Sequence, residues 1–325
     1  MNRKSMMEIV RNNGILFVIL LLILVTGITE RNFLTIGNLL NVLRQVAVVG
    51  IVACGMTYCI IGGAFDLSVG SVVSLAGVIT ILSINSGTNE FVAIAFGLLA
   101  GVTIGVINGV LISLINGRSS EAFIVTYGMQ VVVASIALFP SNGLFIAGRI
   151  SDGFFKSLGQ GFTPIVIFLG IATIMQFVLM KTRYGRHMCF IGSNMNVAKM
   201  SGINVKLNRI SYFALSGLLA GLGGIVLCSR VTSSNPTVGL NYEMDVIAAV
   251  VVGGTPMSGG KGSVYRTVVG AVIIGIMSNA LNILGITAYH QQIVKGALII
   301  VAVAMDILNK QLSLREMANA KAYIA

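Results

Sequence analysis

The chain consists largely of repeated apolar runs that approach the length of a membrane-spanning helix. Residues 13–29, for example, are almost wholly apolar, and comparable runs recur along the sequence. A helix needs roughly 20 such residues to cross the hydrocarbon core of a bilayer. Charged residues make up only 10% of the 325 residues, whereas an ordinary soluble domain carries roughly 25%. The sequence therefore predicts an all-α polytopic membrane protein rather than a soluble globule.

Counting the runs predicts about ten transmembrane helices in a single transmembrane domain over residues 1–325. The expected spans are residues 13–29, 38–61, 69–84, 91–115, 122–139, 164–180, 210–228, 245–253, 267–284 and 292–308. We expect the first span to be retained, because it is longer than the apolar core of a signal peptide and no small-residue cleavage site follows it. One short segment could be re-entrant instead of spanning.

A basic segment, residues 181–209, fixes the expected orientation. It carries Lys181, Arg183, Arg186, Lys199, Lys206 and Arg209 and has no Asp or Glu. Basic residues in short loops are retained on the cytoplasmic side of a membrane, so this segment and both termini are predicted to lie inside. The net charge of +11 is spread over loops and termini, so it indicates topology in an inner (cytoplasmic) membrane and predicts no nucleic-acid partner.

Two glycine-rich interruptions, one in each half of the chain, share a layout. Residues 62–72 read G-G-A-F-D-L-S-V-G-S-V, and residues 253–264 read G-G-T-P-M-S-G-G-K-G-S-V. Paired interrupted helices in the two halves of a transporter point to a substrate path, because broken helices expose backbone groups that only a cavity or another segment can satisfy. The alternative is a pair of ordinary glycine-rich turns. The second segment does not encode a nucleotide site, since Thr255 and Gly262 break the phosphate-loop pattern.

Several polar side chains fall within or beside apolar runs. Asp66 either faces the path or, with Ser68, caps the helix that follows. Ser68 and Gly70 lie in the same segment and are candidates for the substrate path together with Asp66. The amides of Asn108, Asn279 and Asn282 suit a hydroxyl-rich ligand or bonds between neighbouring helices. Because no nucleophile, base or metal-ligand cluster stands out in the sequence, we expect no catalytic residue, no metal site and no cofactor bound by this chain.

Ordered motifs extend over nearly the full length. They are F-L-T-I-G-N-L-L-N-V-L-R-Q from Phe33, the segment after Gly62, G-V-I-N-G-V-L-I from Gly105, A-F-I-V-T-Y-G-M from Ala122, T-R-Y-G-R-H-M-C-F-I-G-S-N with S-G-I-N-V in the basic segment, and V-V-G-G-T-P-M-S-G-G-K-G-S with M-S-N-A-L-N-I-L-G-I after it. With these motifs the chain resembles the permease subunit of ABC sugar importers of the ribose, galactose, xylose and autoinducer-2 type.

The resemblance implies a mechanism and a set of partners. Two permeases, either two copies or this chain with a related one, would form the path through the lipid, and Phe123 and Thr126 would join the path candidates. A periplasmic or lipid-anchored binding protein would deliver a monosaccharide or similar small polyol. A separate ABC ATPase, holding ATP and Mg, would drive import. Residues 181–209 would be the coupling loop, with a short helix over 196–201 and contributions from Arg186, Gly192, Asn194, Ala198, Gly202 and Ile203.

Two other classes of function stay open at this level. An ion-coupled secondary transporter would need ionisable residues in its spans, and beyond Asp66, Lys295 and Asp306 the sequence offers few. A membrane-embedded enzyme would need a catalytic constellation that the sequence does not show. The basic segment could also contact lipid headgroups rather than an ATPase.

Overall fold

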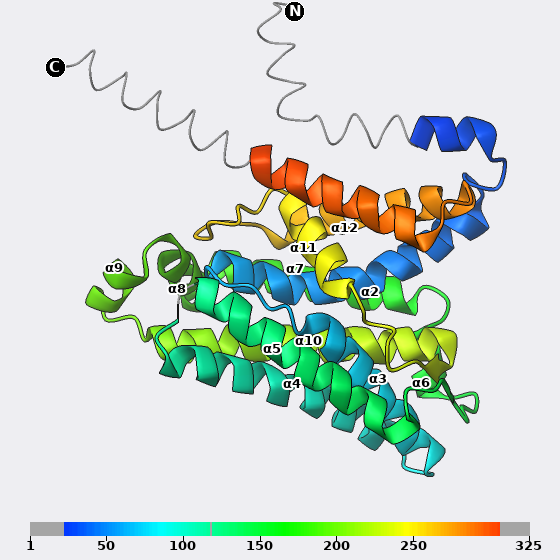
Figure 1. Ribbon diagram of the computed structural model, residues 1–325, viewed down its shortest axis with the longest axis horizontal. Coiled ribbons are helices and arrows are strands. Elements are labelled where there is room, and N and C mark those ends of the chain that lie inside the picture. The colour runs from blue at the N-terminus through cyan, green and yellow to red at the C-terminus, as the bar shows by residue number, and fades with distance from the viewer. Residues whose placement is uncertain (1–22, 118, 306–325) are drawn as a thin grey trace, which may run out of the picture. The chain divides into compact units, whose positions relative to one another are not determined.

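The computed structural model describes residues 23–117 and 119–305 (Figure 1). The described residues fall into two compact units, one of residues 35–275 and one of residues 23–34 with 276–305. Regular structure in the first unit is almost entirely helical. The helices are α2 (Ile36–Ile61), α3 (Val69–Asn85), α4 (Glu90–Leu114), α5 (Ser119–Leu138), α6 (Phe154–Leu158), α7 (Thr163–Lys181), α8 (Arg183–Ser193), α9 (Met195–Met200), α10 (Val205–Val231), α11 (Tyr242–Val252) and α12 (Val264–Ile283), the last of which continues into the second unit.

Seven helices in the described residues are long and apolar enough to cross a membrane. They are α2, α4, α5, α7, α10, α12 and the helix over Ala288–Met305, and the shorter α3 is also apolar. The predicted all-α polytopic membrane fold is therefore supported. The count of ten spans stays a prediction. Most of the first expected span lies outside the described residues, and its described part, residues 23–29, is helical.

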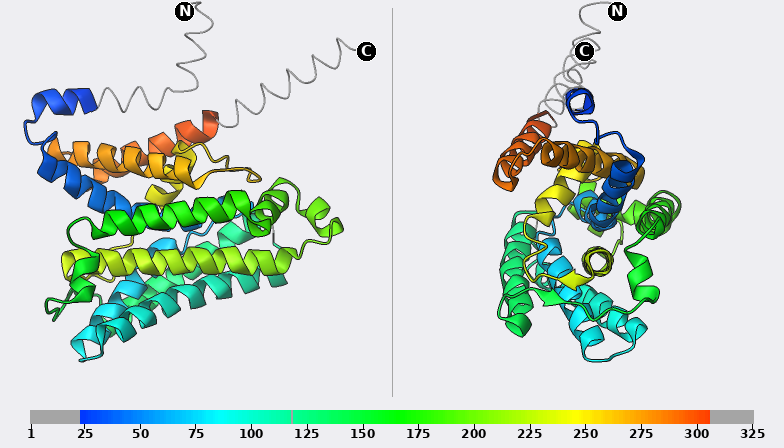
Figure 2. Two further views of the ribbon diagram at one scale, coloured as in Figure 1. Left: turned by 180° about the vertical axis from the view of Figure 1, so that it is seen from behind. Right: turned by 90° about the vertical axis from the view of Figure 1, so that its right-hand side faces the viewer.

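Helix α10 lies at the centre of the larger unit and packs against α2, α3 and α4 (Figures 1 and 2). Its contact with α4 is close because α4 places a glycine at every fourth position: Gly97, Gly101, Gly105 and Gly109. A side chain on Gly105 would overlap the backbone of Phe213 in α10. Small residues at this spacing let two membrane helices approach backbone to backbone.

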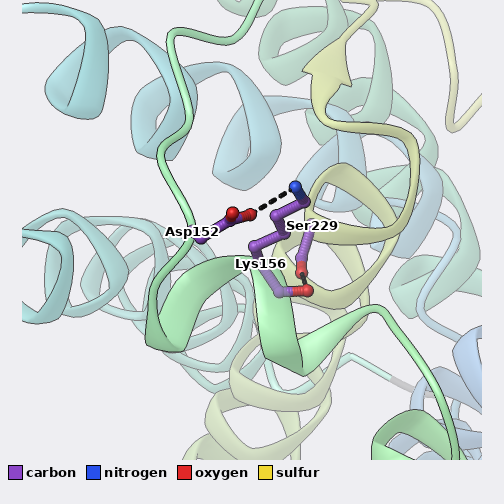
Figure 3. A network of polar contacts seen from close by, with 3 residues as sticks. All are labelled: Asp152, Lys156 and Ser229. Atoms are coloured by element: carbon purple, nitrogen blue, oxygen red, sulfur yellow. Dashed lines mark hydrogen bonds and ion pairs between the residues drawn. The ribbon is translucent and has the colours of Figure 1, made fainter.

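The two ends of α10 carry different structures. Its first turns lie beside α8 and α9, and we call this the α8–α9 end. At the other end, the α6 end, lie the short 3-10 helix η1 (Phe139–Ser141) and two short antiparallel strands, β1 (Ile146–Ala147) and β2 (Ser233–Ser234). Figure 3 shows part of how α6 is held there: Ser229 of α10 donates to the Lys156 carbonyl, and Lys156 Nζ lies 2.6 Å from Asp152 Oδ1. Ser229 also donates to the Phe155 carbonyl.

The smaller unit is mostly helical. Residues 23–29 form a helix in which the Thr29 hydroxyl donates to the Val25 carbonyl at 3.0 Å. The last residues of α12 and the helix over 288–305 are joined through Gln291, whose amide donates to Asn282 Oδ1 at 2.7 Å and to the Ile286 carbonyl at 2.8 Å. These two bonds fix the turn between the two helices.

Three expected segments differ from the structure. The basic segment is mostly helical, and α10 already begins at Val205, so Arg209 lies buried in a helix and donates to the Ile112 carbonyl at 3.2 Å. Residues 235–241, expected in an external loop, run into the bundle beside α3, where Gly239 N donates to Ser74 Oγ at 2.9 Å. Helix α11 has 11 residues, about 16 Å, and is too short to cross a bilayer. It is a half-helix within a segment that leads from strand β2 at the α6 end to Gly260, which lies against Ile61 and Ser193 near α8.

Candidate functional site

The first interrupted segment is a buried turn between α2 and α3. Asp66 Oδ1 accepts from the Ser68 amide at 3.2 Å and from the Ser68 hydroxyl at 2.6 Å. Asn108 of α4 donates to Ser68 Oγ at 2.9 Å and lies 3.5 Å from Asp66 Oδ1. All three residues are buried. Asp66 therefore binds the backbone at the start of α3, as the capping interpretation expected, and Asn108 makes the bond between neighbouring helices that was one of its two predicted roles.

Helix α5 holds the same turn from its other side. The Thr126 hydroxyl donates to the Phe65 carbonyl at 3.2 Å as well as to the Ala122 carbonyl of its own helix at 2.9 Å. The Ser119 hydroxyl, at the first residue of α5, donates to the Gly63 carbonyl. The carbonyl groups that the broken helix exposes are thus satisfied by hydroxyls of a neighbouring helix, as the absence of water in a bilayer requires.

The second interrupted segment meets the first through glycines. Gly260 N donates to the Ile61 carbonyl at 2.8 Å. A side chain on Gly192 of α8 would overlap that carbonyl and crowd the Gly260 amide. Gly259 and Gly260 have φ of 75° and 81°, and Gly63 has φ of 81°. We call Gly63, Gly192, Gly259 and Gly260 the glycine contact.

The glycine contact joins both interrupted segments to the end of α8. Only glycine fits at Gly192 because backbone of two other segments occupies the space of a Cβ. The paired layout in the two halves therefore corresponds to one place in the structure, where the two interrupted segments are in direct contact. A cavity of about 360 Å³ lies beside it, lined by residues that include Ser119, Asn196 and Ser258.

The predicted coupling helix is α9, one residue earlier than expected. Asn194 caps it by accepting from the amides of Asn196 at 3.0 Å and Val197 at 3.1 Å. Gly202 turns the chain after it with φ of 78°. Gly192, which the sequence led us to place in the coupling loop, is a helical residue of α8 at the glycine contact.

The α8–α9 segment has its own small core and an exposed basic side. Ala198 is buried with Ile191 and Val205, and Ile203 packs against them. Arg186 is exposed. Lys181, Arg183 and Lys199 are exposed as well. The segment is therefore a folded element with a charged surface and not a flexible linker.

The remaining path candidates are Gly70, Phe123, Asn279 and Asn282. Asn279 and Asn282 belong to the smaller unit, so they are not placed against Asp66. Phe123 is 49% exposed on α5. Gly70, in the first turn of α3, contacts the segment before α11, because a Cβ there would overlap the Gly239 carbonyl.

The sequence analysis missed a buried carboxylate, Glu243. It lies in the first turn of α11, is 4% exposed, and accepts a bond of 2.9 Å at Oε1 from the Gln130 amide of α5. One signal could have found it: the apolar run that follows Asp245 is too short to span, so α11 had to begin inside the bilayer and carry Glu243 with it.

Comparisons with known proteins give consistent similarities. Residues 38–303 match the family described as "Branched-chain amino acid transport system / permease component". The chain is 38% identical over 299 residues to the ribose import permease RbsC of Escherichia coli K12, which covers 90% of this chain and 92% of that one. It is 39% identical over 295 residues to RbsC of Haemophilus influenzae, with coverage of 89% and 90%. It is 34% identical to the D-allose permease AlsC of Escherichia coli K12, with coverage of 90% of both chains.

Proposed function

The chain belongs to the permease family of ABC importers, as a multi-pass protein of the bacterial inner membrane, and from that premise we propose that it forms the path for a monosaccharide, a pentose or hexose, or a similar small polyol. The observation that carries this proposal is similarity over about 90% of the chain to permeases named for ribose and allose. The chain itself is the non-catalytic component. A separate ABC ATPase, with its ATP and Mg, supplies the free energy.

Orientation follows from the charges at the two ends of α10. The α8–α9 end carries Lys181, Arg183, Arg186, Lys199 and Lys206, all exposed. The α6 end carries four basic residues, Arg44, Arg149, Lys156 and Arg230, together with the acidic Glu90 and Asp152. By the positive-inside rule the α8–α9 end is cytoplasmic, and about ten spans with both termini inside complete the topology. A periplasmic or lipid-anchored binding protein then docks at the α6 end, and a second copy or related permease completes the path.

The α8–α9 segment is the contact for the ATPase. Its support is its exposed basic side, its capped helix and its link to both interrupted segments through the glycine contact. Movement of α9 would reach the path through Gly192. Replacing residues 196–202 with a flexible linker should abolish sugar-stimulated ATP hydrolysis, and normal coupling in that variant would contradict the assignment.

The deciding experiment is ATP hydrolysis and sugar uptake by the chain in proteoliposomes, with and without its cognate ATPase and loaded binding protein. We expect uptake only with the ATPase, and only of one sugar, for which ribose and allose are the first candidates. Uptake without the ATPase that follows an ion gradient would instead support a secondary transporter.

A further inference from the structure

One buried carboxylate lies deep in the bundle without a full set of partners. Glu243 Oε1 accepts from Gln130, but among the described residues Oε2 has no hydrogen-bond partner although it is buried. A carboxylate held in a bilayer is costly, and such residues commonly face a substrate or ion path. A buried oxygen without a donor needs a water, an ion or a ligand hydroxyl to satisfy it.

The depth of this carboxylate is close to the middle of the bundle. Glu243 Oε2 occupies the space that a Cβ on Gly70 would take. At 1.5 Å per residue, Gly70 lies roughly 22 Å along α3 from Asn85, whose amide donates to Ala147 in strand β1 at the α6 end. Gln130 lies roughly 16 Å along α5 from Ser119, which bonds Gly63 at the glycine contact.

Helix α11 begins at this depth. Asn241, just before it, has φ of 67°, and the chain leading to it is irregular and runs alongside α3. Half-helices that start near the midplane, beside irregular chain, form the substrate sites of many transporters. The first turn of α11 is therefore where a path would be expected to hold its solute.

Helix α5 carries aromatic side chains on the same face as Gln130. Phe123, Tyr127 and Gln130 are spaced i, i+4 and i+7, so they share one face of the helix. Tyr127 is 57% exposed and Phe123 49% exposed on the chain. A carboxylate and an amide bind hydroxyl groups, and an aromatic face covers the apolar face of a sugar ring.

We propose that Glu243, with Gln130 and the aromatic face of Tyr127 and Phe123, is a midplane binding site for the hydroxyl groups of the transported solute. Glu243 Oε2 accepts a hydroxyl, Gln130 orients the carboxylate, and the aromatic rings cover the ring of the solute. The assignment rests on the proposed function, because it takes the solute to be a sugar or polyol.

The test separates solute movement from ATP hydrolysis. We would reconstitute the full complex in proteoliposomes and measure labelled sugar moved per ATP hydrolysed for wild type, Glu243→Gln, Tyr127→Ala and Tyr127→Phe. Loss of a charged acceptor should lower this ratio about 10- to 100-fold in Glu243→Gln, with complex assembly and basal hydrolysis kept. Tyr127→Ala should lower it as well, and Tyr127→Phe should keep it. Glu121→Gln, an exposed carboxylate in the first turn of α5, is the matched control.

The outcomes distinguish a failure of the proposed site from a failure of the proposed function. A Glu243→Gln complex that assembles and moves sugar at the wild-type ratio overturns the site. If Glu243→Gln fails to assemble, Tyr127→Ala decides, because Tyr127 is exposed and its loss should not affect folding; a wild-type ratio there overturns the site. A wild-type complex that moves none of the sugars overturns the proposed function and the site with it, whereas a working wild type isolates the failure to the site.

Discussion

At the scale of single residues, the backbone around Gly192 leaves no room for a side chain. A Cβ there would meet the Ile61 carbonyl and the Gly260 amide, both backbone atoms that cannot rotate away. At Gly170 of α7, by contrast, an added Cβ would have no neighbour within 4 Å. Both glycines lie in helices and differ in their surroundings, which makes them a matched pair.

We expect Gly192→Ala to destabilise the chain and to weaken coupling to the ATPase. Overpacking against fixed backbone costs about 1–3 kcal/mol, so the melting temperature in detergent should fall. Gly170→Ala should leave the melting temperature unchanged or raise it, because alanine is the better helix former. Equal melting temperatures and equal sugar-stimulated hydrolysis in the two variants would contradict the importance of the glycine contact.

Asp66 tests the two roles that the sequence left open. Asp66→Ala removes the acceptor for the Ser68 amide and hydroxyl, which should cost about 1–3 kcal/mol in unfolding free energy. Asp66→Asn keeps an acceptor oxygen and should lose less. If the role is local bonding, Asp66→Asn also keeps sugar uptake. A stable Asp66→Asn variant that no longer transports would assign Asp66 to the path instead.

At the scale of elements, α9 is a short helix that depends on its cap. Asn194→Ala leaves the amides of Asn196 and Val197 without their acceptor, which costs about 0.5–2 kcal/mol for an N-cap. We expect sugar-stimulated ATP hydrolysis to fall while the melting temperature of the whole chain changes little. Asn194→Ser, which also caps, should restore hydrolysis. Full stimulation in Asn194→Ala would argue against α9 as the coupling helix.

The close packing of α4 against α10 also belongs to the scale of elements. Glycines at every fourth residue of α4 let the two backbones touch, and α10 thereby becomes the centre around which α2 and α3 pack. The first interrupted segment is then held by side chains of α4 and α5, and the second by the Ile61 carbonyl and by Gln176 of α7. The path candidates on α3 and α5 are positioned by this packing and not by their own sequence.

At the scale of the whole molecule, chemical labelling of Cys189 can test the orientation of the chain in the membrane. Cys189 lies half-buried in α8, whereas Cys54, Cys59 and Cys228 are buried in α2 and α10. Burial raises the pKa of the Cys189 thiol above its ordinary value of 9.0. Only the thiolate reacts with a maleimide, so the labelling rate of Cys189 should be low at pH 7. It should continue to rise through pH 9, where the labelling rate of an exposed thiol would begin to level off.

A membrane-impermeant maleimide should label Cys189 in inside-out vesicles and leave it unlabelled in right-side-out vesicles. The other three cysteines should react only after denaturation, which provides the internal control. Labelling of Cys189 in right-side-out vesicles would reverse the proposed orientation.

The sequence by itself determined the fold class, the span boundaries of α2, α3, α4, α5 and α7 to within a few residues, the interrupted segments and the short helix near Asn194. These depend on local quantities: apolar run length, glycine pairs and capping residues. The family, too, was predicted correctly from the resemblance of its motifs.

Only the tertiary structure decided which of these features meet. That Gly192 touches both interrupted segments, that Arg209 is buried, and that Glu243 lies beside Gly70 and Gln130 are contacts between residues far apart in the chain. No local pattern encodes them. The half-helix α11 depends on packing as well, because the irregular chain of residues 235–241 can lie inside the bundle only where neighbouring helices satisfy its backbone, as Ser74 does for Gly239.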